Sequence, residues 1–251
     1  MCKSHARLFF ISSRWSNWET GRSGLVVSEI SPGELRINEI SSALKKVRSD
    51  IPDNATLIVV TKTFPVSDVE ILYQLGERNF GENRDEEGRE KSAVLPEDSI
   101  WHFQGNLQSN KIRSIVSWAD FIHSLDKESH AQKIDEAART IGKRQKVFLQ
   151  VNLDPGERNE KRSGIDPSEF DRFSELLLAF NSIELVGLMG VAPLGKDPAP
   201  GFELLYELSL SLRTRKSDAA FISAGMSGDY PVALRFGATH IRIGSSILGS
   251  R

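Results

Sequence analysis

The fold of this chain is indicated first by the segment Leu57-Ile58-Val59-Val60-Thr61-Lys62-Thr63-Phe64-Pro65. Its apolar run is rich in β-branched residues and is followed by a proline turn, which is typical of a strand buried on both faces. Strands of this kind form parallel sheets and barrels, and α/β barrels place their chemistry at the C-terminal strand ends. Lys62 stands at such an end. If desolvated there, it would be a neutral nucleophile that forms an imine with an aldehyde. The alternative is a lysine that simply reaches into water.

Similar short apolar segments recur along the chain, separated by segments of helix length. The segments predicted as strands are 57–60, 79–81, 100–103, 121–124, 147–151, 185–189, 220–223 and 240–243. Helices are predicted over 107–118, 129–141, 167–181 and 202–213. Alternation of strands and helices implies parallel strands joined by crossovers. Eight repeats favour a single closed (β/α)8 TIM barrel over a doubly wound open sheet.

The chain divides into two regions. Residues 1–33 show no sustained periodicity and are expected to be a disordered extension, whereas 34–251 form the barrel domain. A helix is predicted over 35–49 from an apolar stripe of five residues, Leu35, Ile37, Ile40, Leu44 and Val47. Because the chain ends soon after the eighth strand, this helix is expected to cover the barrel surface that a full eighth helix normally covers.

Composition excludes several classes of function. The 251 residues carry a formal net charge of −2 with both signs interspersed, so neither nucleic acid nor a membrane surface is an expected partner. No apolar run approaches the roughly 20 residues that span a bilayer. Cys2 is the only cysteine, which excludes an intramolecular disulfide and fits a reducing cytoplasm. No histidine pairing has metal-ligand spacing, so no metal site is predicted.

Polar residues at the ends of the second and third predicted strands are further candidates for a site. Asn83 follows the second strand and could bind a ligand or cap a helix. His102 lies in the third strand and could be a ligand-binding residue or a satisfied core histidine.

Two small-residue turns follow the last two predicted strands, at 223–229 and 242–246. Backbone N–H groups and hydroxyls at helix starts bind phosphate, and barrels commonly build phosphate sites after strands seven and eight. A phosphate site formed by these two turns, together with Lys62, suits a ligand that carries both an aldehyde and a phosphate. Pyridoxal 5′-phosphate and a sugar phosphate both qualify. Arg242 favours the former if it points into the barrel beside a ring.

At these positions the sequence resembles the pyridoxal phosphate homeostasis proteins, which share the fold of the alanine racemase N-terminal domain. The resemblance covers about residues 35–251 and departs from the family pattern at two positions. Gln104 replaces a residue that is usually apolar, and Ser245 replaces a common threonine. The motifs that carry it are Val60-Thr61-Lys62-Thr63, Phe80-Gly81-Glu82-Asn83, His102-Phe103-Gln104-Gly105, Leu107-Gln108-Ser109-Asn110-Lys111, Gly187-Leu188-Met189, Gly225-Met226-Ser227-Gly228-Asp229 and Arg242-Ile243-Gly244-Ser245.

The resemblance implies a role for each of eight residues. Lys62 would hold pyridoxal phosphate as a Schiff base, and Arg242 would face its pyridine nitrogen. The remaining residues would bind the phosphate or line the pocket: Ser227, Gly244, Ser245 and the Met226 backbone for the phosphate, Asn83 and His102 for the pocket.

The resemblance also implies a carrier or regulator in vitamin B6 homeostasis and amino/keto-acid balance, with little or no turnover. An arginine is effectively always protonated, so it would keep the pyridine nitrogen unprotonated and the ring a weak electron sink. A racemase also needs a second acid/base. In two-domain racemases a β-rich domain supplies this group, and no such domain is recognised before Arg251.

Two alternatives remain, a racemase that uses His102 and a Schiff-base aldolase acting on a sugar phosphate. We expect a cytoplasmic monomer whose partners are pyridoxal phosphate and, as recipients, pyridoxal phosphate-dependent apoenzymes.

Overall fold

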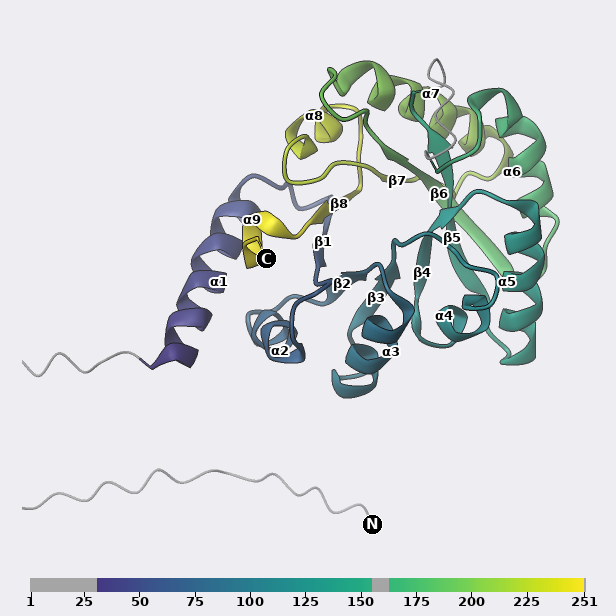
Figure 1. Ribbon diagram of the computed structural model, residues 1–251. Helices are drawn as coiled ribbons and strands as arrows, with labels where there is room; N and C mark the ends of the chain where they lie inside the picture. The colour runs from purple at the N-terminus through teal and green to yellow at the C-terminus, as the bar shows by residue number, and fades with distance from the viewer. Residues whose placement is uncertain (1–30, 155–162, 251) are drawn as a thin grey trace, which may run out of the picture.

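The computed structural model describes residues 31–154 and 163–250, and in this part of the chain eight parallel strands close into a barrel (Figure 1). Each strand pairs with the next, and β8 pairs with β1, so the predicted TIM barrel is confirmed. The strands are β1 (Thr56–Val60), β2 (Asn79–Glu82), β3 (Ile100–Phe103), β4 (Phe121–Leu125), β5 (Gln145–Asn152), β6 (Ile183–Val191), β7 (Phe221–Ser223) and β8 (His240–Ile243).

Helices surround the barrel: α2 to α8 lie in the connections between strands, α1 precedes β1 and α9 follows β8 (Figure 1). They are α1 (Pro32–Ser49), α2 (Val66–Gln74), α3 (Asp85–Val94), α4 (Ile112–Trp118), α5 (Glu128–Thr140), α6 (Phe170–Leu178) after the 3-10 turn Pro167–Glu169, α7 (Ala199–Arg215), α8 (Tyr230–Arg235) and α9 (Ser245–Leu248). The helix predicted over 107–118 begins only at Ile112. None of the described helices is both long and apolar enough to cross a membrane.

Helix α1 begins earlier than the sequence suggested. Ser31 caps it, since its hydroxyl accepts from the Glu34 N–H at 3.3 Å while Glu34 Oε2 accepts from the Ser31 N–H at 2.9 Å. Disorder predicted for 31–33 is therefore wrong, whereas 1–30 lie outside the described residues.

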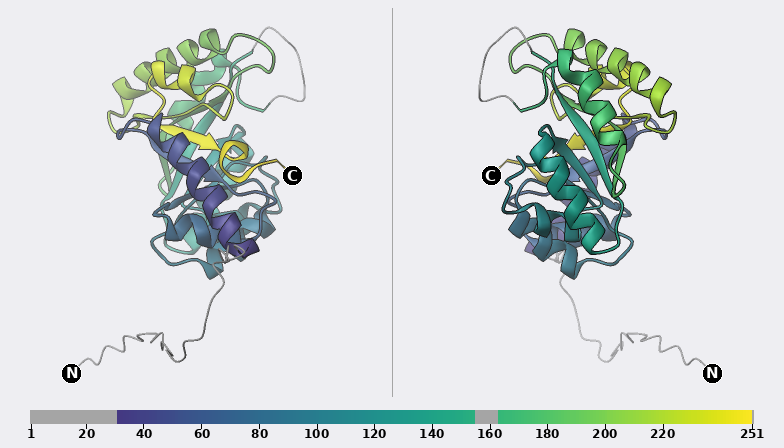
Figure 2. Two further views of the ribbon diagram at one scale, coloured as in Figure 1. Left: turned by 90° about the vertical axis from the view of Figure 1, so that its left-hand side faces the viewer. Right: turned by 90° about the vertical axis from the view of Figure 1, so that its right-hand side faces the viewer.

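The apolar stripe predicted for α1 is only partly buried. Ile40, Leu44 and Val47 pack into the core, but Leu35 and Ile37 are exposed. Helix α1 lies on the outside of the barrel beside the short α9 (Figure 2).

The core has two layers. A large shell packs between strands and helices, and a smaller cluster fills the barrel lumen. The apolar members of the lumen cluster are Ile100, Phe121, Phe148, Val186 and Met189. The imidazoles of the third and fourth strands stack in the same space, His102 on Phe121 at 4.8 Å and His123 on Phe148 at 4.3 Å between ring centroids. The barrel is therefore filled by aromatic, aliphatic and buried polar side chains.

Candidate functional site

A cavity of about 420 Å³ opens at the C-terminal ends of the strands. Its size suits a small ligand. Among the residues that the structure describes, the lining comes from the ends of β1, β2, β3, β6, β7 and β8: Val60, Lys62, Asn83, Gln104, Met189, Val191, Met226, Ser227, Gly228, Arg242, Gly244 and Ser245. Seven of the eight residues predicted for the site are therefore brought together here.

Lys62 lies in the turn that follows β1 and is exposed, so the expected desolvation of its amine is not found. The next residue, Thr63, has φ 68°, a left-handed conformation that is strained for a β-branched residue. The Thr63 N–H donates to Glu87 Oε2 of α3 at 2.6 Å. The preceding residue, Thr61, is buried and its hydroxyl donates to Glu82 Oε1 at 2.5 Å. Both neighbours of Lys62 are thus fixed to other elements.

A buried ion pair is hydrogen-bonded to the backbone just before Lys62. Lys91 Nζ lies 2.6 Å from Glu82 Oε1 and donates to the Thr61 carbonyl at 2.8 Å. Both side chains of the pair are almost completely buried. Burial raises the pKa of Glu82, and the hydrogen bond and charge of Lys91 oppose that rise. Lys91 was missed from the sequence because α3 shows little amphipathic patterning and was not predicted.

Arg242 points into the barrel from β8 and is buried. Its Nη1 donates to Ser223 Oγ at 2.6 Å and its Nη2 to the Gly190 carbonyl at 3.0 Å. Burial lowers the pKa of Arg242 to about 10, and the charge of Asp229 opposes this. The guanidinium therefore remains a cation at neutral pH.

The two small-residue turns meet across the cavity. Ser245 Oγ lies 3.3 Å from Ser227 Oγ, so two hydroxyls from separate turns face one point. A Cβ at Gly244 would lie 3.0 Å from the Val60 carbonyl oxygen, so the closeness of this turn to β1 favours glycine. The helices that follow have only six and four residues, so the hydroxyls, not a long helix dipole, define this part of the site.

Met226 was predicted to bind phosphate through its backbone. Its N–H donates to Asp229 Oδ1 at 2.6 Å within the turn. Its side chain is 41% exposed and lines the cavity. In this conformation the Met226 side chain lines the site, and the phosphate-binding role of its amide stays a prediction.

His102 does not line the cavity, which corrects the prediction that it would. It is fully buried, one layer below the mouth, and both its ring nitrogens are engaged. Successive inward side chains of a strand are two residues apart, or about 6.6 Å. From β3 these are Ile100, His102 and then Gln104, so Gln104 reaches the cavity and His102 stays in the lumen.

Two polar atoms at the cavity wall are buried without a hydrogen-bond partner in the described part of the chain. They are Asn83 Oδ1, an acceptor, and Gln104 Nε2, a donor. Buried polar groups in proteins are almost always paired, so unpaired groups on a cavity wall suit a polar ligand. Gln104 was singled out in the sequence only as a departure from the family pattern.

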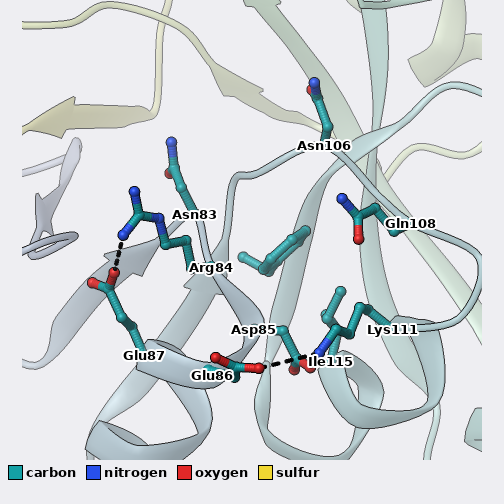
Figure 3. Close-up of a pocket in the computed structure, with 10 residues that line it drawn as sticks. Asn83, Arg84, Asp85, Glu86, Glu87, Asn106, Gln108, Lys111 and Ile115 are labelled. Carbon is teal, nitrogen blue, oxygen red and sulfur yellow. Dashed lines mark hydrogen bonds and ion pairs between the residues drawn. The ribbon is translucent and has the colours of Figure 1, made fainter.

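A second cavity of about 310 Å³ adjoins the first and shares Asn83 (Figure 3). Its cations are paired: Arg84 lies 3.1 Å from Glu87, and Lys111 lies 3.4 Å from Glu86. This cavity is therefore poorly suited to an anion. The described residues also contain no group of three or more His, Cys, Asp or Glu side chains that could hold a metal ion.

Three buried histidines are expected to make stability depend on pH. Burial lowers the pKa of His102 and His123 well below the usual value, and burial with the charge of Arg242 lowers that of His240 to about 4. In the unfolded chain these rings take up protons near pH ~6.5. The free energy of unfolding should therefore be highest above about pH 7 and fall as the pH drops, with about 3 kcal/mol from His240 alone by pH ~4.

Urea unfolding at about pH 7.5, 6 and 5 measures this fall. A His240→Gln variant should show a shallower dependence, because one of the titrating rings is gone. Equal stability of the native chain at all three pH values would contradict the expectation.

Comparisons with known proteins agree with this geometry. The family model described as alanine racemase, N-terminal domain matches residues 35–251. The alanine racemase of Clostridium difficile has the same fold, with a TM-score of 0.72 and 15% identity over 85% of this chain and 57% of the racemase chain. Fold and site thus define a barrel of the alanine racemase N-terminal type.

Relatives of higher sequence identity identify the family more specifically. A Mycobacterium tuberculosis protein named pyridoxal phosphate homeostasis protein is 33% identical over 256 residues, covering 90% of this chain and 98% of the relative. PipY of Synechococcus elongatus, solved with pyridoxal phosphate bound, is 34% identical with a TM-score of 0.73 over 84% of this chain and 100% of PipY. The chain belongs to the pyridoxal phosphate homeostasis protein family.

Proposed function

We propose that this protein binds pyridoxal 5′-phosphate as a Schiff base on Lys62 and serves vitamin B6 homeostasis and amino/keto-acid balance, with little or no catalytic turnover. The observation that carries this proposal is one cavity lined by Lys62, by the buried cation Arg242 and by the facing hydroxyls of Ser227 and Ser245. The names of the relatives and the ligand of PipY support it.

The residues at the cavity fit this cofactor. When bound, it supplies an aldehyde that condenses with an amine, losing water. Lys62 provides the amine. Ser227 and Ser245 provide two donors for phosphate oxygens, and the unpaired Asn83 Oδ1 and Gln104 Nε2 offer an acceptor and a donor to the remaining polar groups.

Arg242 is proposed to set the reactivity of the bound ring. Its pKa of about 10 keeps it protonated, so beside a pyridine nitrogen it acts as a donor and does not transfer a proton. An unprotonated pyridine withdraws electrons weakly, which disfavours carbanion chemistry.

The lining itself offers little acid–base chemistry. Of the described residues that line the cavity, only Lys62 and Arg242 carry titratable side chains. Racemization needs an acid/base on each face of the substrate. His102, the group considered for a racemase, lies below the cavity. The family relationship gives the sugar-phosphate aldolase no support.

Exposure of Lys62 suits a carrier. Schiff-base formation is reversible, and an exposed amine allows water or another amine to exchange the cofactor, which makes pyridoxal phosphate-dependent apoenzymes the proposed recipients. A cytoplasmic location is proposed, because the single cysteine Cys2 fits a reducing compartment. A monomer is proposed as the acting form.

The test is the visible absorption spectrum of the protein incubated with pyridoxal phosphate, before and after borohydride, followed by peptide mass mapping. A yellow band that borohydride abolishes, with a reduced pyridoxyl phosphate group on Lys62, supports the proposal. A protein that remains colourless and unmodified overturns it. Measurable racemization of alanine by the loaded protein would overturn the claim of little turnover.

A further inference from the structure

A continuous chain of side-chain hydrogen bonds crosses the barrel lumen below the cavity. From Arg242 Nη1 it passes to Ser223 Oγ at 2.6 Å and from Ser223 Oγ to His123 Nδ1 at 2.8 Å. It continues from His123 Nε2 to His102 Nδ1 at 2.9 Å and ends with His102 Nε2 at Asn79 Oδ1, 3.1 Å away. These five side chains, called the lumen relay below, come from β8, β7, β4, β3 and β2.

Most of the lumen relay is shielded from water and held by packing. His102, His123, Ser223 and Arg242 are all buried, Asn79 is half-buried, and the two imidazoles stack on phenylalanine rings. Asn79 begins β2 at the opposite end of the barrel and does not line the cavity. The hydrogen-bonded path from Asn79 to the site therefore runs through His102, His123 and Ser223.

The chemistry of the two ends fixes the direction of every hydrogen bond. Arg242 can only donate, and the Asn79 oxygen can only accept. In the described residues the Ser223 hydroxyl has no acceptor other than His123 Nδ1, so its hydrogen points there. His123 then carries its hydrogen on Nε2 and donates to His102 Nδ1, and His102 carries its hydrogen on Nε2 and donates to Asn79.

This arrangement requires both imidazoles to be neutral, since a doubly protonated ring would place two hydrogens between the histidines or between His123 and Ser223. The surrounding charges favour neutrality. Burial lowers the pKa of His102, assisted by His240 and Lys146, and burial lowers that of His123, assisted by His102 and Arg242.

We propose that the lumen relay is a one-directional hydrogen-bond chain that orients the Arg242 guanidinium, making Asn79, His102, His123 and Ser223 positioning residues for the cofactor ring. This proposal deepens the proposed function and rests on it for the ring. The relay and the Gly190 carbonyl hold Nη1 and Nη2, so the guanidinium plane is fixed where Arg242 lines the cavity. None of the four positioning residues lines that cavity in the described chain.

The first test needs no cofactor. Long-range ¹H–¹⁵N correlation spectra of the ¹⁵N-histidine-labelled full chain report which ring nitrogen carries hydrogen. Signals are assigned by their loss in His102→Phe and His123→Phe. We expect His102 and His123 to be neutral and protonated on Nε2 from about pH 6 to 8. A charged ring, or hydrogen on Nδ1 of either ring, would overturn the lumen relay.

The second test uses Asn79→Leu, which removes the terminal acceptor at the far end of the barrel. Gln145→Leu is the matched control, since Gln145 begins β5, is buried, and donates to the Asp120 carbonyl at 2.9 Å outside the relay. We expect Asn79→Leu to shift the absorption maximum of bound pyridoxal phosphate and to weaken its binding roughly tenfold. Gln145→Leu should lower thermal stability without changing spectrum or affinity.

If Asn79→Leu loses stability but keeps the wild-type spectrum and affinity, the relay is structural only and the proposal is wrong. If Asn79→Leu does not fold, a Ser223→Ala variant, which removes the acceptor of Arg242 Nη1, replaces it. The absorption maximum and the affinity for pyridoxal phosphate are then measured on that variant, and the Nε2 assignment tests the hydrogen-bond chain independently. If the wild-type protein binds no pyridoxal phosphate, the proposed function fails and the role in ring positioning fails with it, while the nitrogen assignment still tests the hydrogen-bond chain.

Discussion

Lys62→Ala is expected to abolish covalent attachment of pyridoxal phosphate and to weaken its binding on the order of 100-fold, or about 2.8 kcal/mol. Unfolding temperature should be unchanged. Lys62 is exposed beyond the end of β1 and makes no hydrogen bond to the described residues, so its removal leaves neither a cavity in the core nor an unpaired partner. Spectroscopic titration with pyridoxal phosphate, borohydride trapping and thermal unfolding measure these effects.

The matched control is Lys127→Ala. Lys127 is also an exposed lysine that follows a strand, here β4, and it precedes α5. It does not line the cavity, so attachment and affinity should stay at wild-type levels. An adduct that persists in Lys62→Ala, or maps to Lys127, would show that the amine has been wrongly assigned. Unfolding of Lys62→Ala would show that the residue has a structural role that the geometry does not predict.

Lys91→Met is expected to lower the free energy of unfolding by about 3–5 kcal/mol, because it leaves the buried Glu82 carboxylate without its cation. It should also weaken binding of pyridoxal phosphate, since the Thr61 carbonyl, one residue before Lys62, loses one of its two donors and keeps only the Phe64 N–H. Urea unfolding and spectroscopic titration give the two magnitudes.

Two further variants distinguish the effect of breaking the buried Glu82–Lys91 pair from the effect of removing any lysine. Lys111→Met removes a half-exposed cation 3.4 Å from Glu86 and should change stability by no more than about 1 kcal/mol. The double variant Lys91→Met with Glu82→Gln should recover much of the loss, because no unpaired charge remains buried. A Lys91→Met protein as stable as the wild type would mean that the pair contributes nothing.

Much of the fold could be predicted from local patterns. Buried strands of a barrel are short apolar runs with β-branched residues, and the segments 100–103 and 240–243 were found at their observed bounds. Helices α2, α3 and α8 were not predicted, because they are short and weakly patterned or begin beside polar turns. The helix predicted over 107–118 started too early, since apolar residues alone do not mark a helix start.

The candidate site could be predicted to the level of strand ends. Lys62, Arg242 and the two serine-containing turns follow directly from position, since all parallel strands of a barrel end at one mouth. What the sequence did not reveal at His102 and Met226 has another cause. How deep a side chain lies, and whether an amide is already bonded within its turn, depend on three-dimensional packing that no spacing along the chain records.

By itself the sequence determined the order of the strands, the position of the amine at the mouth and the family. Each is a property of consecutive residues or of motifs in a fixed order. Only the tertiary structure decided which polar groups meet across the barrel. The Glu82–Lys91 pair and the lumen relay join residues from different strands and helices, and closure of the barrel sets their distances. A hydrogen bond between His123 and Ser223, 100 positions apart, exists only because β4 and β7 face one lumen.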